Sequence, residues 1–107
     1  MQINLDYKRP EPKKGEEQIT NSELTVDYIN YSVRTFYKDG LDSQWRRIWG
    51  RIQRKLDEAL DTKVGEVNFE QAELDFLKKA VKEVKVPSEL AKYFVVLEDE
   101  LENKNGK

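Results

Sequence analysis

The chain of 107 residues contains no cysteine and no histidine. Without cysteine, disulfide bonds and thiolate metal sites are excluded, and the composition is typical of a reducing compartment. Without histidine, the chain lacks the commonest general base and the commonest transition-metal ligand. We therefore expect no metal and no cofactor.

Long apolar runs are missing as well. None approaches the ~20 residues that a membrane-spanning helix needs, and the first residues, MQINLDYKRP, do not have the apolar core of a signal peptide. These absences predict a cytoplasmic protein that does not contact a membrane.

Charged residues are abundant and nearly balanced. They make up 37% of the chain, with 19 basic and 21 acidic side chains and a net charge of -2. A domain that binds polyanions over its whole surface usually has a clear basic excess, which this chain does not have. Because the apolar residues are strongly patterned, we expect residues 1–107 to fold as a single domain rather than remain disordered.

The amino-terminal residues alternate between apolar and polar. Ile3, Leu5 and Tyr7 share one side, which predicts a half-buried strand. The residues that follow, 8–18, carry two prolines, a glycine and many charges, and predict a flexible loop or arm. Since a lone strand leaves its backbone groups unpaired, the strand needs a mate. Residues 64–69 are the internal candidate, and another chain is the alternative.

Two amphipathic helices are predicted next. The first spans residues 22–37, with Ser22 or Thr25 as its cap, and it stops before Gly40, which suits the left-handed position after a helix. The second spans residues 43–60 and has the clearest pattern in the chain, with apolar residues recurring at spacings of three and four. Its apolar stripe is formed by Trp45, Ile48, Trp49, Ile52, Leu56, Ala59 and Leu60.

Two further helices complete the expected fold. Asn68, with Gln71 three residues later, has capping-box spacing and predicts the start of a third helix. Two adjacent apolar stripes on that helix indicate that it is central and packed on two sides. Pro87 ends it, Ser88 caps a fourth helix, and residues 103–107 form a frayed tail. The predicted fold class is mainly α, with four helices and a minor strand pair.

The predicted helix over 43–60 carries basic residues opposite its apolar stripe. This face can be a solvated surface neutralised by acidic neighbours, a contact surface for a protein, or a phosphate-binding surface for nucleic acid. Two lysines of the arm can add to it. The candidate contact residues are Arg46, Arg47, Arg51, Arg54, Lys55, Lys13 and Lys14.

Two smaller features accompany that face. Gly50 lies within it, where glycine either permits close approach of another backbone or ring or is simply tolerated. Four carboxylates near the end of the fourth helix oppose the helix dipole. They predict a solvated end, with a docking surface for a basic partner as the alternative; EF-hand spacing is absent. These carboxylates belong to Glu98, Asp99, Glu100 and Glu102.

Catalytic patterns are not found. The sequence contains no nucleophile beside a base, no evident carboxylate pair and no glycine-rich phosphate loop. We therefore expect a protein that is not an enzyme.

The layout also carries a resemblance. The chain resembles small proteins of tailed phages and prophages in four features. These are a short first strand, a Leu-Thr entry into the first helix (Leu24 and Thr25), the V-x-F-x-x-x-E-L-x-x-L-K-K motif over 67–79 and an acidic last helix. The resemblance implies an accessory, assembly or host-modulating protein that acts in the host cytoplasm by binding protein. It implies no active site.

The sequence thus favours a non-enzymatic protein-interaction module, with an unidentified protein or a second copy as its partner. The alternative is a small nucleic-acid-binding protein that uses the basic face over 43–60. Both interpretations assume that the apolar stripes face inward, so that Trp45, Trp49 and Leu97 are buried.

Overall fold

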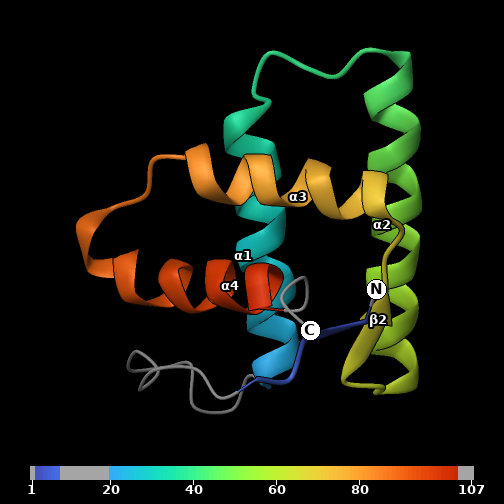
Figure 1. Ribbon diagram of the computed structural model, residues 1–107, viewed down its shortest axis with the longest axis vertical. Helices are drawn as coiled ribbons and strands as arrows, with labels where there is room; N and C mark the ends of the chain where they lie inside the picture. Colours follow the sequence, from blue (N-terminus) through green and yellow to red (C-terminus); the bar gives the residue numbers. More distant parts are fainter. Residues whose placement is uncertain (1, 8–19, 104–107) are drawn as a thin grey trace.

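The computed structural model describes residues 2–7 and 20–103. They form four α-helices and two short strands, which confirms the predicted mainly α fold with a minor strand pair (Figure 1). The predicted arm at 8–18, with Lys13 and Lys14, lies outside the described residues, as do residues 104–107 of the predicted tail. The elements are β1 (Gln2–Asn4), α1 (Asn21–Phe36), α2 (Ser43–Thr62), β2 (Glu66–Asn68), α3 (Gln71–Glu83) and α4 (Ala91–Asn103).

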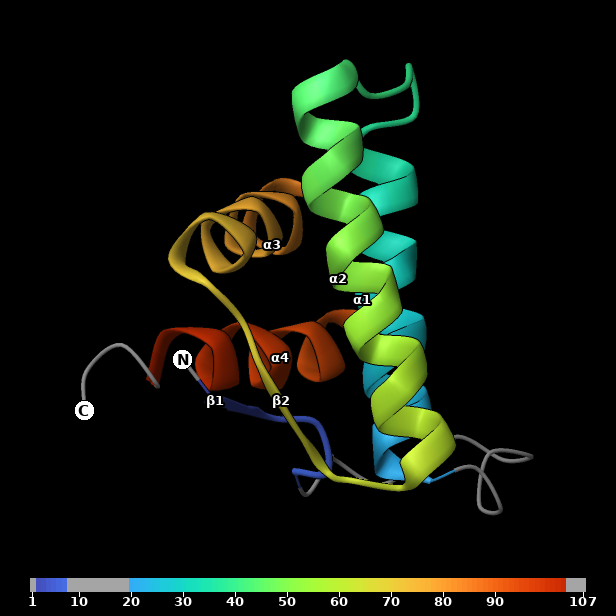
Figure 2. The same ribbon diagram turned by 90° about the vertical axis from the view of Figure 1, so that its right-hand side faces the viewer.

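The helices form two layers. α1 and α2 lie side by side as an antiparallel hairpin, and α3 and α4 cross one side of this hairpin (Figures 1 and 2). The ends of α1 and α2 that are joined by residues 37–42 extend beyond α3 (Figure 1). This protruding part is called the hairpin tip below. α3 meets the base of the tip, where the ring of Phe76 contacts those of Tyr37, Trp45 and Trp49.

The amino-terminal strand finds its mate within the chain. β1 pairs with β2 in antiparallel register, with Ile3 opposite Val67. The Leu5 N–H extends the ladder by donating to the Gly65 carbonyl at 2.7 Å. Ile3 and Leu5 are fully buried, as the alternation predicted, and the internal mate near 64–69 is confirmed.

The start of α1 differs from the prediction. The cap is Thr20, whose side chain accepts from the Glu23 N–H while the Glu23 carboxylate accepts from the Thr20 N–H, so the two form a capping box. Neither Ser22 nor Thr25 caps the helix. Thr25 is buried, and its hydroxyl donates to the Leu5 carbonyl at 2.8 Å, which ties α1 to the segment after β1. The need to satisfy that buried carbonyl explains the threonine better than a capping role.

The later helix starts also shift. Asp42 caps α2, accepting from the Trp45 N–H at 3.0 Å. Asn68, by contrast, lies in β2, and the cap of α3 is Glu70. The strand pairing takes Asn68 into extended backbone and so delays the helix. Ser88 opens a short 3₁₀ turn, and α4 begins only at Ala91.

The core confirms the central place of α3. This helix lies against α1, α2 and α4. Most of its two apolar stripes is buried, whereas Ala72 is exposed and Val84 is only partly buried. Leu97 of α4 is fully buried, as expected. The buried residues of α3 include Leu74, Phe76, Leu77, Ala80 and Val81.

The assumption that every apolar stripe faces inward is wrong at the hairpin tip. Trp45 is 37% exposed, and Trp49 is only partly buried. Both residues belong to the predicted stripe of α2, but they lie near the end of the helix that extends beyond α3. The sequence pattern reports which side of a helix is apolar, and it does not report where the neighbouring helix ends.

Gly50 is not a point of close approach among the described residues. A Cβ built there meets no other heavy atom within 4 Å. We expect Gly50→Ala to raise the free energy of unfolding by about 0.5–1 kcal/mol, because alanine loses less backbone entropy in a helix. Urea denaturation would measure the change.

Gly40→Ala is the matched control for that substitution. Gly40 has φ +102°, so alanine should destabilise the chain there. A Gly50→Ala protein that is less stable than the wild type would show that the position is more crowded than the structure indicates.

Candidate interaction surface

A buried carboxylate organises one flank of α2. Glu73 is fully buried, and its two oxygens accept from Lys55 Nζ at 2.6 Å and from Arg51 Nε at 3.3 Å. The same carboxylate accepts from the Glu70 N–H at 2.9 Å. Buried charges persist when they are paired and hydrogen-bonded. Glu73 therefore joins the start of α3 to the middle of α2.

The pKa of Glu73 reflects this surrounding. Burial acts to raise it, but the hydrogen bonds from Lys55, from the Glu70 N–H and from Arg51, with the charge of Lys55, hold the pKa below its usual value. The carboxylate is thus ionised near neutral pH. Its charge neutralises part of the predicted basic face from within the protein.

The predicted basic face of α2 is divided by the fold into three parts. Arg51 and Lys55 are held by Glu73. Arg47 and Arg54 are exposed, and neither has an ion pair with a described residue. Arg46 lies on the other flank of α2, in a hollow shared with the end of α1. The five residues therefore do not act as one continuous basic surface.

The hollow at the hairpin tip brings three cations together. It has a volume of ≈ 520 Å³ and opens to solvent between the last turn of α1 and the first turns of α2. Arg34 and Lys38 reach it from the α1 side, and Arg46 reaches it from α2; all three are exposed. Sequence spacing could not reveal this set, because the turn between the helices brings Arg34 and Arg46 into one site.

Aromatic rings form the floor of the same region. Tyr37 and Trp49 line the hollow, and both pack on Phe76 of α3, with ring centroids 4.9 Å and 6.0 Å away. Trp45 does not line the hollow, but its ring also packs on Phe76, with ring centroids 5.6 Å apart. The tip thus combines half-buried aromatic surface with positive charge, the composition that is enriched in the centres of protein interfaces.

Acidic groups near the tip limit its positive charge. Burial and then the negative charge of Glu83 raise the pKa of the Tyr37 hydroxyl, so a negative charge acts on one residue that lines the hollow. Asp42, at the other end of the joining loop, is engaged in capping α2. The field at the tip is therefore moderate, and it is concentrated where the three cations line the hollow.

The acidic end of α4 is partly paired within the chain. Glu102 forms ion pairs with Lys82 at 2.6 Å and with Lys78 at 3.8 Å, both on α3. Its pKa is lowered, first by the hydrogen bond from Lys82. Glu102 therefore fastens α4 to α3 while its side chain stays 40% exposed.

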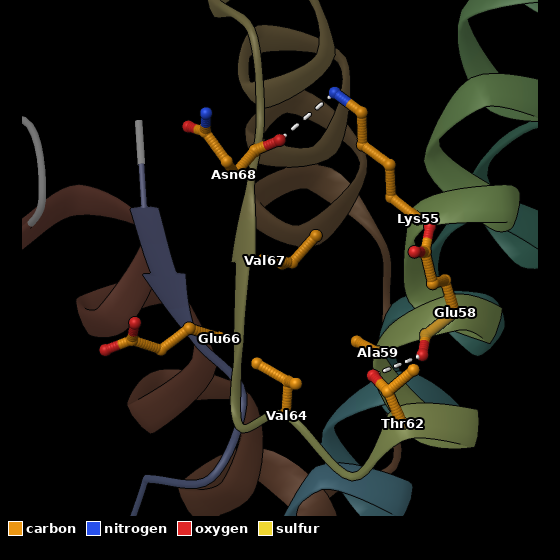
Figure 3. A pocket seen from close by; sticks show the side chains of 8 residues that line it. All are labelled: Lys55, Glu58, Ala59, Thr62, Val64, Glu66, Val67 and Asn68. Atoms are coloured by element: carbon orange, nitrogen blue, oxygen red, sulfur yellow. Dashed lines mark hydrogen bonds between the residues drawn. The ribbon is translucent and has the colours of Figure 1, made fainter.

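A second hollow separates α2 from β2. It has a volume of ≈ 420 Å³, and Figure 3 shows β2 on one side and the carboxyl-terminal half of α2 on the other. Lys55 closes one end by donating to the Asn68 carbonyl at 3.1 Å. Val64, 51% exposed, lies at the other end. This hollow is called the β2 groove below.

Neither comparison with known proteins nor a search for metal sites and membrane-spanning helices assigns a function to the chain. No family model, no curated protein and no solved structure matches it. Within residues 2–7 and 20–103, no group of three or more acidic side chains is placed to hold a metal ion. Across that same part of the chain, no helix is both long and apolar enough to cross a membrane.

Sequence reasoning missed Glu73 as an organising residue. The signal was present, because Leu77 and Ala80 follow Glu73 at spacings of four and seven, which places the carboxylate on the buried side of α3. A glutamate on an apolar stripe predicts a buried partner of opposite charge. The identity of that partner required the packing of α2 against α3.

Proposed function

We propose that this chain is a non-enzymatic protein-interaction module that binds an acidic segment of another protein at the hairpin tip. The observation that carries the proposal is the hollow in which Arg34, Lys38 and Arg46 surround the rings of Tyr37 and Trp49. Cations beside aromatic rings favour a ligand with carboxylates and an apolar or aromatic side chain. Arg46 is retained from the sequence-based set of contact residues, and Arg34 and Lys38 join it.

A protein partner is favoured over nucleic acid for two reasons. The net charge of -2 and the nearby Glu83 oppose long-range attraction of a polyanion. Three cations around one hollow also fit a short acidic segment better than an extended phosphate backbone. The nucleic-acid alternative keeps one favourable feature, because tyrosine and tryptophan rings can stack on bases.

A defined peptide tests the proposal. We expect a short peptide of aspartates around a single phenylalanine to change the fluorescence of Trp49 on titration, since that ring lines the hollow. The double substitution Lys38→Glu with Arg46→Glu should weaken binding about ten- to thirtyfold, because two attractive exposed pairs become repulsive.

The matched control reverses two other arginines of α2. Arg47→Glu with Arg54→Glu makes the same change in net charge, but these side chains do not line the hollow. It should leave binding within about threefold of wild type, because exposed charges that do not contact the ligand contribute little to its affinity. Equal loss of peptide affinity in both doubly substituted proteins would show that net charge, not the hollow, determines binding.

The competing assignment has its own measurement. Oligothymidylate that binds more tightly than the acidic peptide, with a log-log salt slope near about -2 for three single-strand contacts, would replace the protein-binding proposal by nucleic-acid binding. Weak binding of oligothymidylate supports a protein partner.

The biological setting is also a proposal. We infer a phage-encoded accessory, assembly or host-modulating protein from the layout resemblance alone, and it acts in the host cytoplasm. Affinity capture from the native cell, with the wild type compared against the Lys38→Glu and Arg46→Glu double, would identify the partner. Proteins retained by the wild type and lost only with that double are the expected result.

A further inference from the structure

The outer edge of β2 has backbone groups that the fold leaves unpaired. In an antiparallel ladder, residues alternate between pointing their N–H and C=O at the partner strand and away from it. The Leu5–Gly65 hydrogen bond and the register of β1 with β2 turn Val67 toward β1. The N–H and C=O of Glu66 therefore point away from β1, toward the β2 groove.

The Asn68 carbonyl confirms this direction. It is two residues beyond Glu66, so it points to the same side, and it accepts from Lys55 across the groove (Figure 3). Within the described part of the chain, the backbone of Glu66 has no hydrogen-bond partner. One end of the edge is thus capped by Lys55, and at the other end the Val64 N–H donates to the Ala59 carbonyl at 3.0 Å. Between them, the N–H and C=O of Glu66 are open.

The groove walls add an apolar contact. Ala59, Val64 and Val67 line it, and Val64 is one of the most exposed large apolar residues described, at 51%. Figure 3 shows Val67 turned toward α2 and the Glu66 side chain turned to the other side of β2. A strand beside β2 would follow the same alternation, with one set of side chains entering the groove.

The charged residues at the β2 groove favour a ligand that carries a basic side chain. Glu58 and Glu66 flank the groove. Among the described residues, Lys55 is the one basic residue that lines it, and Glu73 already engages it. A residue directly opposite Glu66 would place its side chain beside the Glu66 carboxylate, where a basic group is favoured. A second copy of β2 would instead bring acidic side chains together, which disfavours symmetric self-pairing.

We propose that the outer edge of β2 is a docking site for an extended segment of a partner protein, in which one lysine or arginine lies between two small apolar residues. The basic residue pairs with Glu66 through both backbone and side chain, and its apolar neighbours contact Val64, Val67 and Ala59. This is strand addition to an exposed sheet edge, at a site separate from the hairpin tip.

A capped pentapeptide of sequence Thr-Val-Lys-Val-Thr tests the proposal. Its binding should slow amide hydrogen exchange of Glu66, by roughly tenfold at a peptide concentration ten times the Kd, because exchange occurs from the free protein. No slowing at millimolar peptide would overturn the proposal.

Two altered peptides separate the contributions. Methylation of the backbone nitrogen of the central lysine removes the N–H that would donate to the Glu66 carbonyl, and it should abolish binding. Replacement of that lysine by glutamate should weaken binding at least about tenfold, through repulsion by Glu58 and Glu66. Equal binding of the methylated peptide would show that the groove does not add a strand, and equal binding of the glutamate peptide would refute the charge selection.

The protein variants are matched in exposure. Val64→Lys should weaken binding of the lysine peptide at least about fivefold, because it removes apolar contact and adds a like charge. Val95→Lys is the control, since Val95 is 52% exposed on α4 and does not line the groove. Both chains should keep wild-type stability. Equal weakening in both would contradict the assignment of the site.

The proposal can fail independently of the proposed function. The Lys38→Glu and Arg46→Glu double should bind the lysine peptide as the wild type does, because neither residue lines the β2 groove. If the Glu66 amide were instead protected in proportion to protein concentration, with a dimer in light scattering, a second copy would occupy the edge, and the hetero-partner proposal would be wrong.

Discussion

Replacing Phe76 with alanine is expected to lower the free energy of unfolding by about 3–5 kcal/mol, the usual loss for a buried phenylalanine. The side chain is 1% exposed, and its ring contacts those of Tyr37, Trp45 and Trp49. The tip extends beyond α3, so Phe76 supplies much of its support. Urea denaturation would measure the loss, which is large against a typical total of about 5–15 kcal/mol.

Phe94→Ala is a control of similar size at a different place. Phe94 is 3% exposed, and its ring contacts Tyr28 and Tyr31 of α1. It should destabilise the chain comparably, while the native tryptophan fluorescence changes only with Phe76→Ala. If the Phe76→Ala protein stays fully folded without denaturant and the fluorescence of Trp45 is the same as in the wild type, the tip is supported by something other than the contact with α3.

Phe76→Leu keeps the measurement possible if the alanine protein does not fold. Leucine fills part of the volume and should cost less than alanine. It removes the stacked ring under Tyr37, so it should also weaken binding of the acidic peptide at the hairpin tip. Unchanged peptide binding in a folded Phe76→Leu protein would show that ring stacking does not position the hollow.

Replacing Glu73 with glutamine is expected to lower the free energy of unfolding by about 2–3 kcal/mol. The substitution preserves shape but removes the charge that accepts from Lys55 and Arg51, and charge-assisted hydrogen bonds contribute about 1.5–3 kcal/mol each. Both cations are partly exposed, at 32% and 47%, so water can replace part of what they lose. The expected loss is therefore below that for a fully buried pair.

Asp57→Asn is the matched control for Glu73→Gln. It is also a carboxylate-to-amide change, on the exposed side of α2, and it should alter stability by less than about 0.5 kcal/mol. A Glu73→Gln protein as stable as this control would show that the buried ion pairs contribute no net stability.

The pH dependence follows from the same carboxylate. The pKa of Glu73 is lowered in the folded protein from a value of 4.5. Its contribution is therefore fully present above that ordinary value and is lost as the pH falls through the lowered pKa. The stability difference between wild type and Glu73→Gln should be constant near neutral pH and shrink in acid below about pH 4.5. A difference that grows in acid would contradict the lowered pKa.

Much of the fold could be predicted from the sequence, because hydrophobic periodicity is local. The spacing of apolar residues in α2 and α3 identified both helices, and the alternation of Ile3 and Leu5 identified the buried side of β1. Helix starts were less predictable. Thr25 and Asn68 are both good capping residues, but tertiary contacts use Thr25 to satisfy the Leu5 carbonyl and place Asn68 in β2.

The candidate sites could be predicted only in part. Arg46 was recognised as basic and exposed, but its neighbours Arg34 and Lys38 come from α1 and meet it through the turn at the tip. Arg51 and Lys55 look the same as Arg47 in sequence, yet Glu73 engages them from another helix. The unpaired backbone of Glu66 depends on the register between β1 and β2.

By itself, the sequence determined which side of each helix is apolar, that four helices form, and that no cysteine or histidine chemistry is available. Those properties depend on residues within a few turns of each other. The tertiary structure alone decided that Trp45 is left exposed, that Glu73 neutralises two of the five basic residues of α2, and that the backbone of Glu66 has no hydrogen-bond partner among the described residues. Each of these depends on where distant elements end against one another, and local spacing contains no information about that.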